Sequence, residues 1–278
     1  MGTLFLVATP IGNLEDLSPR ATRILREACL IAAEDTRITR KLLTHFGIHT
    51  PLTSYFEHNK LTKLDRILAG LNKGDVALVS DAGTPTINDP GYELVRAALG
   101  AGHAVSPVPG PSAALAALAA SGLPTDSFLY LGYLPRKSSE RLALADQIAN
   151  LTHTLIFLES PHRLLAALKD LQGALGDRQI AIARELTKVH EEIWRGSISA
   201  GREHFTQSDP RGEFTLVIAG IKRGEKTSWT EDKVMIALKI GLKMGESPAA
   251  LAGRVAQESS WERRKVYKMA IKLKGTVK

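Results

Sequence analysis

The chain has 278 residues, 44% of them hydrophobic and 23% charged, which is typical of a globular protein large enough for more than one domain. The apolar runs at residues 4–8 and 154–158 are far shorter than the roughly 20 residues that a membrane-spanning helix needs. The N-terminus has no basic segment leading into an apolar signal stretch, so we expect a cytoplasmic protein. The single cysteine, Cys29, excludes an internal disulfide, and its apolar neighbours predict a buried side chain.

The formal net charge of +7 is concentrated at the C-terminal end of the chain. Residues 1–220 hold 22 Lys and Arg against 23 Asp and Glu, whereas residues 221–278 hold 14 against 6, a balance of +8. Such an excess of positive charge attracts polyanions, including nucleic acid. A solvated surface without a partner is the alternative interpretation.

Short apolar runs alternate with amphipathic helical patterns up to residue 220, and this alternation predicts layered α/β structure. Strands are predicted at residues 4–8, 30–33, 76–80, 104–108, 128–131, 154–158, 180–183, 191–198 and 214–219. Helices are expected in most of the gaps. Gly, Pro and an acidic residue at 122–126 mark a boundary between two α/β domains, which we place at 1–121 and 122–224.

Only helical patterns follow residue 220, and they predict a basic helical extension at 225–278. Helix starts are predicted at Thr230, at Ser247 before Pro248, and at residues 259–262, which fit a capping box. The last predicted helix carries six basic residues: Arg263, Arg264, Lys265, Lys268, Lys272 and Lys274. The three short helices resemble a helix-turn-helix-like unit, and a solvated packing appendage is the alternative.

Four turns rich in Gly and Pro follow predicted strands or open predicted helices, at residues 8–13, 80–85, 109–113 and 211–215. In parallel α/β sheets, the turns at the carboxyl ends of the strands line the ligand crevice. Gly lets a ligand approach the backbone closely, and Pro fixes φ, so such turns present amides and carbonyls in rigid positions. One such turn is ordinary chain reversal, but four together indicate a ligand site.

The sequence contains neither G-x-G-x-x-G nor G-x-x-x-x-G-K-[ST], which argues against a dehydrogenase and against a P-loop NTPase. A cofactor without a long phosphate chain fits the turns better. S-adenosylmethionine is one candidate, although composition and spacing do not distinguish it from other small ligands. The eight histidines show no metal-ligand spacing, so no metal site is expected.

Eight sequence blocks in order carry a family resemblance. They are LFLVATPIGNLEDLSPRA, AAEDTR, SDAGTPTINDPG, PVPGPSA, LGYLPRK, FLESPHR, ARELTKVHEE and RGEFTLVI. Together they cover residues 4–220 almost without interruption and resemble the bacterial small-subunit ribosomal RNA 2′-O-methyltransferases of the tetrapyrrole-methylase superfamily. The resemblance implies two α/β domains with the methyl donor bound between them, a homodimer, and a cytidine of the ribosomal decoding region as acceptor.

The resemblance also implies which residues bind the donor, S-adenosylmethionine. The N-terminal domain is expected to contribute Pro10, Asp81, Ala82, Gly83, Ser112 and Ala113. The C-terminal domain is expected to contribute Leu134, Leu158, Gly212, Phe214 and Thr215. For Asp81, the alternative is a structural role as the cap of its own turn.

Charged residues at predicted strand ends are the candidates for the acceptor side. They are Glu34, Asp35, Arg37, Glu159, His162, Arg184, Glu185 and Lys188, with Arg40 nearby. Arg and Lys would position RNA phosphates, and a carboxylate or His162 could accept the hydroxyl proton. A ribose hydroxyl is a poor nucleophile, so in-line placement against the sulfonium methyl matters more than a base. Structural ion pairs explain each carboxylate equally well.

Two other functions remain open on the sequence alone. A methylase with a tetrapyrrole or another small acceptor would use the same donor turns, but it would not require the basic extension. A non-catalytic RNA-binding assembly factor would keep the basic extension, but it would have no need of intact Gly and Pro turns.

Overall fold

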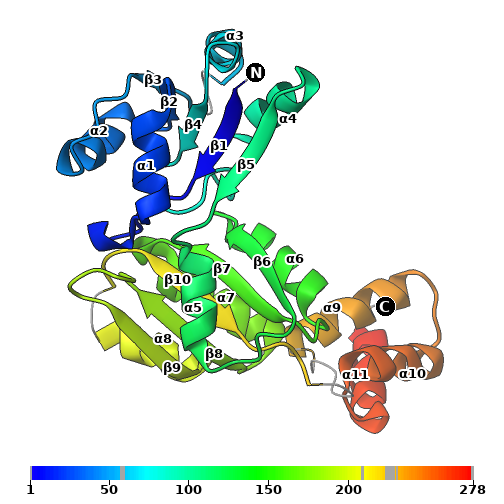
Figure 1. Ribbon diagram of the computed structural model, residues 1–278. Helices are drawn as coiled ribbons and strands as arrows, with labels where there is room; N and C mark the ends of the chain where they lie inside the picture. Colours follow the sequence, from blue (N-terminus) through cyan, green and yellow to red (C-terminus); the bar gives the residue numbers. More distant parts are fainter. Residues whose placement is uncertain (1, 57–59, 208–209, 223–228, 230, 277–278) are drawn as a thin grey trace. The chain divides into compact units, whose positions relative to one another are not determined.

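The structure, a computed structural model, describes residues 2–56, 60–207, 210–222, 229 and 231–276. It separates into two compact units, one made of Met1–Ala116 and Glu185–Glu192, the other of Ala117–Arg184 and Ile193–Lys278. Each unit contains a five-stranded sheet (Figure 1), and this arrangement confirms the predicted α/β class.

The first unit is a parallel sheet with helices on both faces. Its strands are β1 (Thr3–Val7), β2 (Leu30–Ala33), β3 (Leu52–Ser54), β4 (Val76–Val79) and β5 (Ala104–Val108). Its helices are η1 (Leu14–Asp16), α1 (Pro19–Glu27), α2 (Thr36–His45), α3 (Lys60–Leu71), α4 (Tyr92–Gly100) and the start of α5 (Ala113–Ser121). The strand order is β3-β2-β4-β1-β5, and neighbouring strands in this order pair in parallel.

Alternating side chains of the buried strands divide the core of this unit in two. On one face, Ala77 and Val79 of β4 pack in the cluster that includes the apolar sides of α1 and α2. On the other face, Val76 and Leu78 pack with α3 and α4. All four residues of β2 and of β4 are buried, as expected for strands covered on both faces.

The second unit has a mixed sheet of order β6-β7-β10-β8-β9. Its strands are β6 (Phe128–Tyr133), β7 (Thr154–Glu159), β8 (Gln179–Arg184), β9 (Glu192–Ser197) and β10 (Phe214–Ile218). Its helices are α6 (Ser138–Ile148), η2 (Pro161–Arg163), α7 (Leu164–Leu175) and α8 (Ile198–Gln207), followed by three C-terminal helices. Strand β10 is antiparallel to both β7 and β8, and this brings the start of β10 to the ends of those two strands.

Three helices, α9 (Glu231–Lys243), α10 (Pro248–Ser259) and α11 (Arg263–Thr276), form the C-terminal part around a small core of their own. Ser247 caps α10 through Ala250 N, with Pro248 at the first helical position, as predicted. The predicted start at Thr230 lies outside the described residues. The predicted capping box at 259–262 is wrong: Ser259 ends α10, Ser260 is left-handed, and the Ser259 hydroxyl accepts from Trp261 N instead.

Two further expectations differ from the structure. The short strand β3 was not predicted, because three residues with one buried side chain give no periodic signal. Cys29 is exposed rather than buried, because it follows the end of α1, where the chain turns toward β2. Among the helices within the described ranges, none combines the length and apolar character needed to cross a membrane.

Candidate functional site

Three turns meet at the carboxyl edge of the parallel sheet in the first unit, after β1, β4 and β5. Thr9 and Gly83 form an isolated bridge, with N–O distances of 2.9 and 3.0 Å in the two directions. The Thr84 hydroxyl donates to Pro111 O at 3.3 Å and so joins the second turn to the third. Gly83 has φ +83°, a left-handed conformation that favours glycine.

The residues of this edge fit the donor that the family resemblance implies. Ala82 is exposed, Pro10, Ser112 and Ala113 are half-buried, and Gly83 is buried, so small side chains line this edge. The carboxylate of Asp81 reaches beyond its own turn and accepts from Asp35 N at 3.0 Å. Asp81 therefore ties the second turn to the end of β2.

Glu34 and Asp35 extend the same hydrogen-bonded network. Asp81 N donates to Glu34 Oε2 at 3.2 Å. Asp35 is the N-cap of α2 and accepts from Arg37 N at 2.8 Å, and its carboxylate pairs with the Arg37 guanidinium at 2.6 Å. The structure thus brings three predicted acceptor-side residues next to one predicted donor-side residue.

The carboxylates of this network differ in their pKa. Burial raises the pKa of Glu34 and of Asp81, whereas hydrogen bonds from Arg37 lower the pKa of Asp35 to about 2. Asp89 was missed by the sequence reasoning: burial first, then repulsion from Glu34 and Asp81, raises its pKa to about 6. The signal that could have found it was its place within the block SDAGTPTINDPG.

Within the described part of the chain, no group of three or more His, Cys, Asp and Glu side chains is placed to hold a metal ion.

The segment at 185–192 belongs to the first unit although its neighbours in sequence belong to the second. Thr187 Oγ1 accepts from Asn13 N at 3.1 Å, and Lys188 pairs with Glu185 at 2.8 Å. A Cβ on Gly12 would lie 2.4 Å from Lys188 Cγ and 2.8 Å from Thr187 Oγ1. Glycine at position 12 therefore lets this segment approach the first turn closely, which brings Glu185 and Lys188 to the donor-side turns of their own unit.

In the second unit, Glu159 is a buried carboxylate at the end of β7. It pairs with Arg163 at 2.5 Å, and its Oε1 accepts from Ser160 N at 2.7 Å. His162 is exposed on η2, and Arg184 is half-buried at the end of β8. The ion pair gives Glu159 a structural role in holding the turn after β7.

The five predicted donor residues of the second unit gather at one edge of its sheet. Leu134 N donates to Leu158 O at 3.4 Å, and Leu158 pairs with Thr215 in the sheet. Leu134, Phe214 and Thr215 are buried. Gly212, with φ +85°, precedes this edge.

The chain is similar to known methyltransferases over its whole length. The tetrapyrrole (corrin/porphyrin) methylase family matches residues 3–200. A Synechocystis sp. protein named ribosomal RNA small subunit methyltransferase I is 46% identical over 277 residues, which cover 99% of each chain. A protein of the same name from Halalkalibacterium halodurans is 53% identical over 226 residues, 81% of this chain and 78% of that one.

Solved structures share the fold at low sequence identity. A cobalt precorrin-4 methyltransferase has a TM-score of 0.58 at 15% identity and covers 78% of this chain and 94% of its own. A diphthine synthase has a TM-score of 0.61 at 15% identity and covers 79% and 90%. The predicted two-domain tetrapyrrole-methylase fold is confirmed.

Asp89 predicts a pH dependence of stability. Because its pKa is about 6 in the folded protein, above the ordinary 3.8, the native state holds the proton more tightly than the unfolded chain. Ionisation of Asp89 therefore lowers the free energy of unfolding as the pH rises from about 4 to about 6. We expect Asp89→Asn to be more stable than the wild type above this window and equally stable below it.

Urea unfolding at about pH 3.5 and about pH 7.5 measures this difference. Asp65→Asn, at an exposed position of α3, is the control for the loss of one carboxylate. An equal effect of Asp89→Asn at both pH values would contradict the prediction.

Gly83 predicts a loss of donor binding in a folded protein. A Cβ there would make ordinary contacts, 3.6 Å from Ile11 Cγ2 and 3.8 Å from Pro111 O, so the cost is backbone strain at φ +83°. That strain is about 1–2 kcal/mol for an L-residue and distorts the turn that pairs with Thr9. We expect Gly83→Val to abolish S-adenosylmethionine binding in a calorimetric titration while circular dichroism stays unchanged.

Gly47→Val is the matched control for that titration. Gly47 also has positive φ, at +60°, a Cβ there would point into open space, and the residue lies at the far end of α2. Unchanged donor affinity in Gly83→Val would remove the second turn from the donor site.

Proposed function

We propose that this chain, which belongs to the tetrapyrrole (corrin/porphyrin) methylase family, methylates small-subunit ribosomal RNA. The chain is a methyltransferase enzyme that uses S-adenosylmethionine. One observation supports an RNA acceptor. The chain is 46% identical to a ribosomal RNA small subunit methyltransferase I, and the match covers 99% of both chains, including the basic C-terminal helices. A small acceptor such as a tetrapyrrole is not favoured, because the family match to residues 3–200 stops before those helices.

The finer proposal is a 2′-O-ribose methylation of a cytidine in the decoding region of 16S ribosomal RNA. The family resemblance of the sequence blocks supports this position. The bound donor supplies an electrophilic methyl group on a sulfonium. The chain's own task is then to hold the ribose hydroxyl in line with that methyl, because the hydroxyl is a weak nucleophile with a pKa far above neutral.

We assign donor binding to the turns of the first unit and to the sheet edge of the second. The residues are Pro10, Asp81, Ala82, Gly83, Ser112, Ala113, Leu134, Leu158, Gly212, Phe214 and Thr215. The bridge between Thr9 and Gly83 supports this assignment, because it holds the first and second turns together at this edge.

Among the carboxylates, Glu34 is the proposed acceptor of the hydroxyl proton. Burial raises its pKa, which makes it a stronger base than Asp35, whose pKa Arg37 lowers to about 2. Glu159, a further candidate, is held in an ion pair with Arg163. Arg37, His162, Arg184 and Lys188 are proposed to position the RNA around the reacting ribose. Glu185, a further candidate for the proton acceptor, pairs with Lys188.

Mass mapping of methylated nucleotides in ribosomal RNA from cells that lack the protein tests the proposed reaction. One ribose methyl group should disappear from a cytidine of the decoding region and return when the gene is restored. An unchanged methylation pattern would rule the reaction out.

We also propose that the protein acts in the cytoplasm as a homodimer with two α/β domains, 1–121 and 122–224, and a basic extension, 225–278. Symmetric pairs are the common form of soluble homo-oligomers. Light scattering at micromolar concentration should give twice the chain mass of 30.1 kDa. Full activity of a monomer under these conditions would make the dimer incidental to function.

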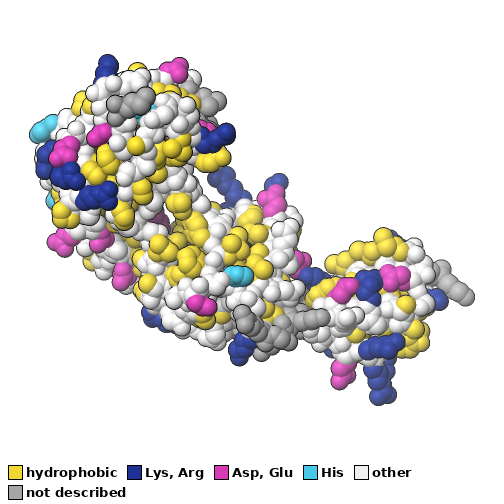
Figure 2. All heavy atoms as spheres, turned by 45° about the vertical axis from the view of Figure 1, so that its right-hand side comes forward, with side chains coloured by type: hydrophobic (Ala, Val, Ile, Leu, Met, Phe, Trp, Pro, Cys, Tyr) yellow, Lys and Arg dark blue, Asp and Glu magenta, His cyan; other side chains and the backbone are white. Residues whose placement is uncertain are grey.

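The C-terminal helices are proposed to bind RNA backbone. In Figure 2 their surface carries several Lys and Arg side chains between acidic and hydrophobic ones. They have their own core, and an ion pair between Lys233 and Asp146 at 2.5 Å connects α9 to α6. A chain that ends at residue 224 should therefore fold and keep its donor affinity.

The truncated chain should bind ribosomal RNA more weakly and with a flatter salt dependence than the full chain. Each lost phosphate contact changes the log–log salt slope by about 0.9 on duplex or about 0.7 on single strands. Circular dichroism and donor titration confirm the fold of the truncated chain. The full chain with Arg263, Arg264 and Lys268 changed to Gln is the second variant, because it keeps the helices in place. If the truncated chain and the Gln variant both bound RNA as tightly as the wild type at every salt concentration, the extension would be a structural appendage.

A further inference from the structure

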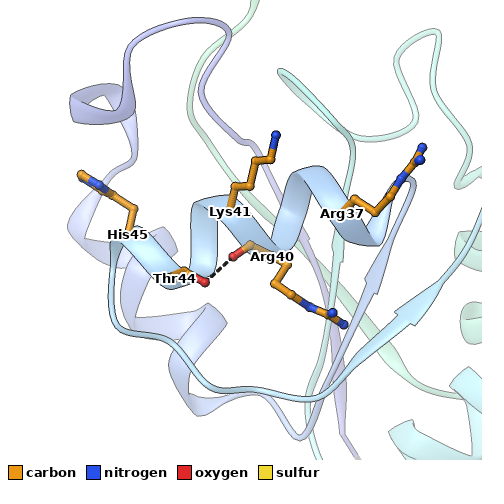
Figure 3. Close-up of a pocket in the computed structure, with 5 residues that line it drawn as sticks. All are labelled: Arg37, Arg40, Lys41, Thr44 and His45. Atoms are coloured by element: carbon orange, nitrogen blue, oxygen red, sulfur yellow. Dashed lines mark hydrogen bonds between the residues drawn. The ribbon is translucent and has the colours of Figure 1, made fainter.

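Helix α2 presents a basic stripe along its solvent face. The stripe consists of Arg37, Arg40, Lys41, Thr44 and His45. Their spacing of i, i+3, i+4, i+7 and i+8 places them on one side of a helix. They line an open depression of about 550 Å³, and in Figure 3 Arg37 and Lys41 extend to the same side of the helix. The opposite face is buried through Leu42 and Leu43.

The stripe is only partly neutralised within the chain. Arg37 is paired with Asp35, but the side chains of Arg40 and Lys41 have no ion-pair partner among the residues that the structure describes. The ring of His45 rests edge-on against Phe46, with ring centroids 4.9 Å apart. Arg26 of α1 adds a further cation at this end, where it donates to Phe46 O.

Helix stability does not account for these charges. Arg37 lies in the first turn of α2, where the helix dipole disfavours a cation, and its ion pair with Asp35 offsets that cost. Arg40 and Lys41 have no such partner among the described residues, and Lys41 lies at i+4 from Arg37, a spacing at which like charges destabilise a helix. An anionic ligand would offset this repulsion, and Arg and Lys side chains are the usual partners of phosphates in protein complexes with nucleic acids.

The stripe begins beside the proposed donor edge. Asp35, the N-cap of α2, donates its backbone N–H to Asp81 of the second turn at 3.0 Å. From Arg37 to His45 the helix rises about 12 Å, at 1.5 Å per residue, which is long enough to contact more than one phosphate. The stripe therefore starts at the donor turn and runs along α2 within the first unit.

We propose that the basic stripe of α2 binds the phosphodiester backbone of the RNA strand beside the nucleotide that is methylated. This inference rests on the proposed ribosomal RNA function and assigns to α2 the positioning of that strand. Arg40, Lys41 and His45 contact phosphates, and Arg37 joins them at the end nearest the donor turn.

The test compares full-length Arg40→Gln/Lys41→Gln with the wild type. The matched control is Arg66→Gln/Lys73→Gln, which removes the same charge from exposed positions on and just after α3, on the opposite face of the sheet. The substrates are small ribosomal subunits that lack the methyl group and a transcript of the decoding region. Methyl transfer gives KM and kcat, and titration of the transcript at several salt concentrations gives the salt slope.

We expect the α2 variant to raise KM for the subunits about tenfold, to lower kcat much less, and to flatten the salt slope on the transcript by about 1.4 to 1.8 for two contacts. Donor affinity should stay unchanged in both variants. The variant Arg40→Lys/Lys41→Arg keeps both positive charges, so it should keep most of the wild-type affinity for RNA.

Three results would overturn the inference. One is an α2 variant with the KM and salt slope of the wild type. A second is an equal loss in the control variant, which would indicate a general effect of net charge. A third is a loss of binding to subunits but not to the transcript, which would place a ribosomal protein on α2. In each of these cases wild-type methylation of the subunits leaves the proposed function standing. A wild type that neither binds nor methylates ribosomal RNA would defeat both.

Discussion

The reciprocal pair of backbone hydrogen bonds between Thr9 and Gly83 is the constraint on which the first unit's ligand edge depends. Parallel strands β1 and β4 end side by side, but their following turns would be free to diverge without this bridge. The Thr9 hydroxyl adds a hydrogen bond to Ser80 O at 3.1 Å, so the bridge is supported by a buried side chain. A left-handed Gly83 is what allows the second turn to meet the first.

Next to this edge, acidic side chains lie on one side and basic side chains follow along α2. Glu34, Asp81 and Asp89 form an acidic side where burial and repulsion from nearby carboxylates raise the pKa values. Asp35 and Arg37 neutralise one another at the start of α2, and basic residues follow. In the proposed function this order matches the two substrates, because the donor carries a cationic sulfonium and the RNA acceptor carries anionic phosphates.

Much of this arrangement was predictable from sequence, because buried parallel strands give continuous apolar runs and their ends are marked by Gly, Pro and charged residues. The pairing of Asp35 with Asp81, 46 positions apart, was not predictable, because it depends on β2 and β4 being neighbours in the sheet. The same holds for the transfer of residues 185–192 to the first unit, where Gly12 admits Lys188. Asp89 was missed because its environment is built by residues of other turns.

The basic stripe of α2 and the C-terminal helices differ in how they are held, and under the proposed function this difference favours different tasks for them. The stripe on α2 is joined to the donor turn by a backbone hydrogen bond from the residue that caps the helix, so its phosphates would be held in register with the reacting ribose. The C-terminal helices have a separate core and share an exposed ion pair with α6. Exposed ion pairs contribute little free energy, so under the proposed function this attachment favours a role in RNA affinity rather than in register. Under the proposed function, we therefore expect α2 to set the register of the RNA and the C-terminal helices to add affinity.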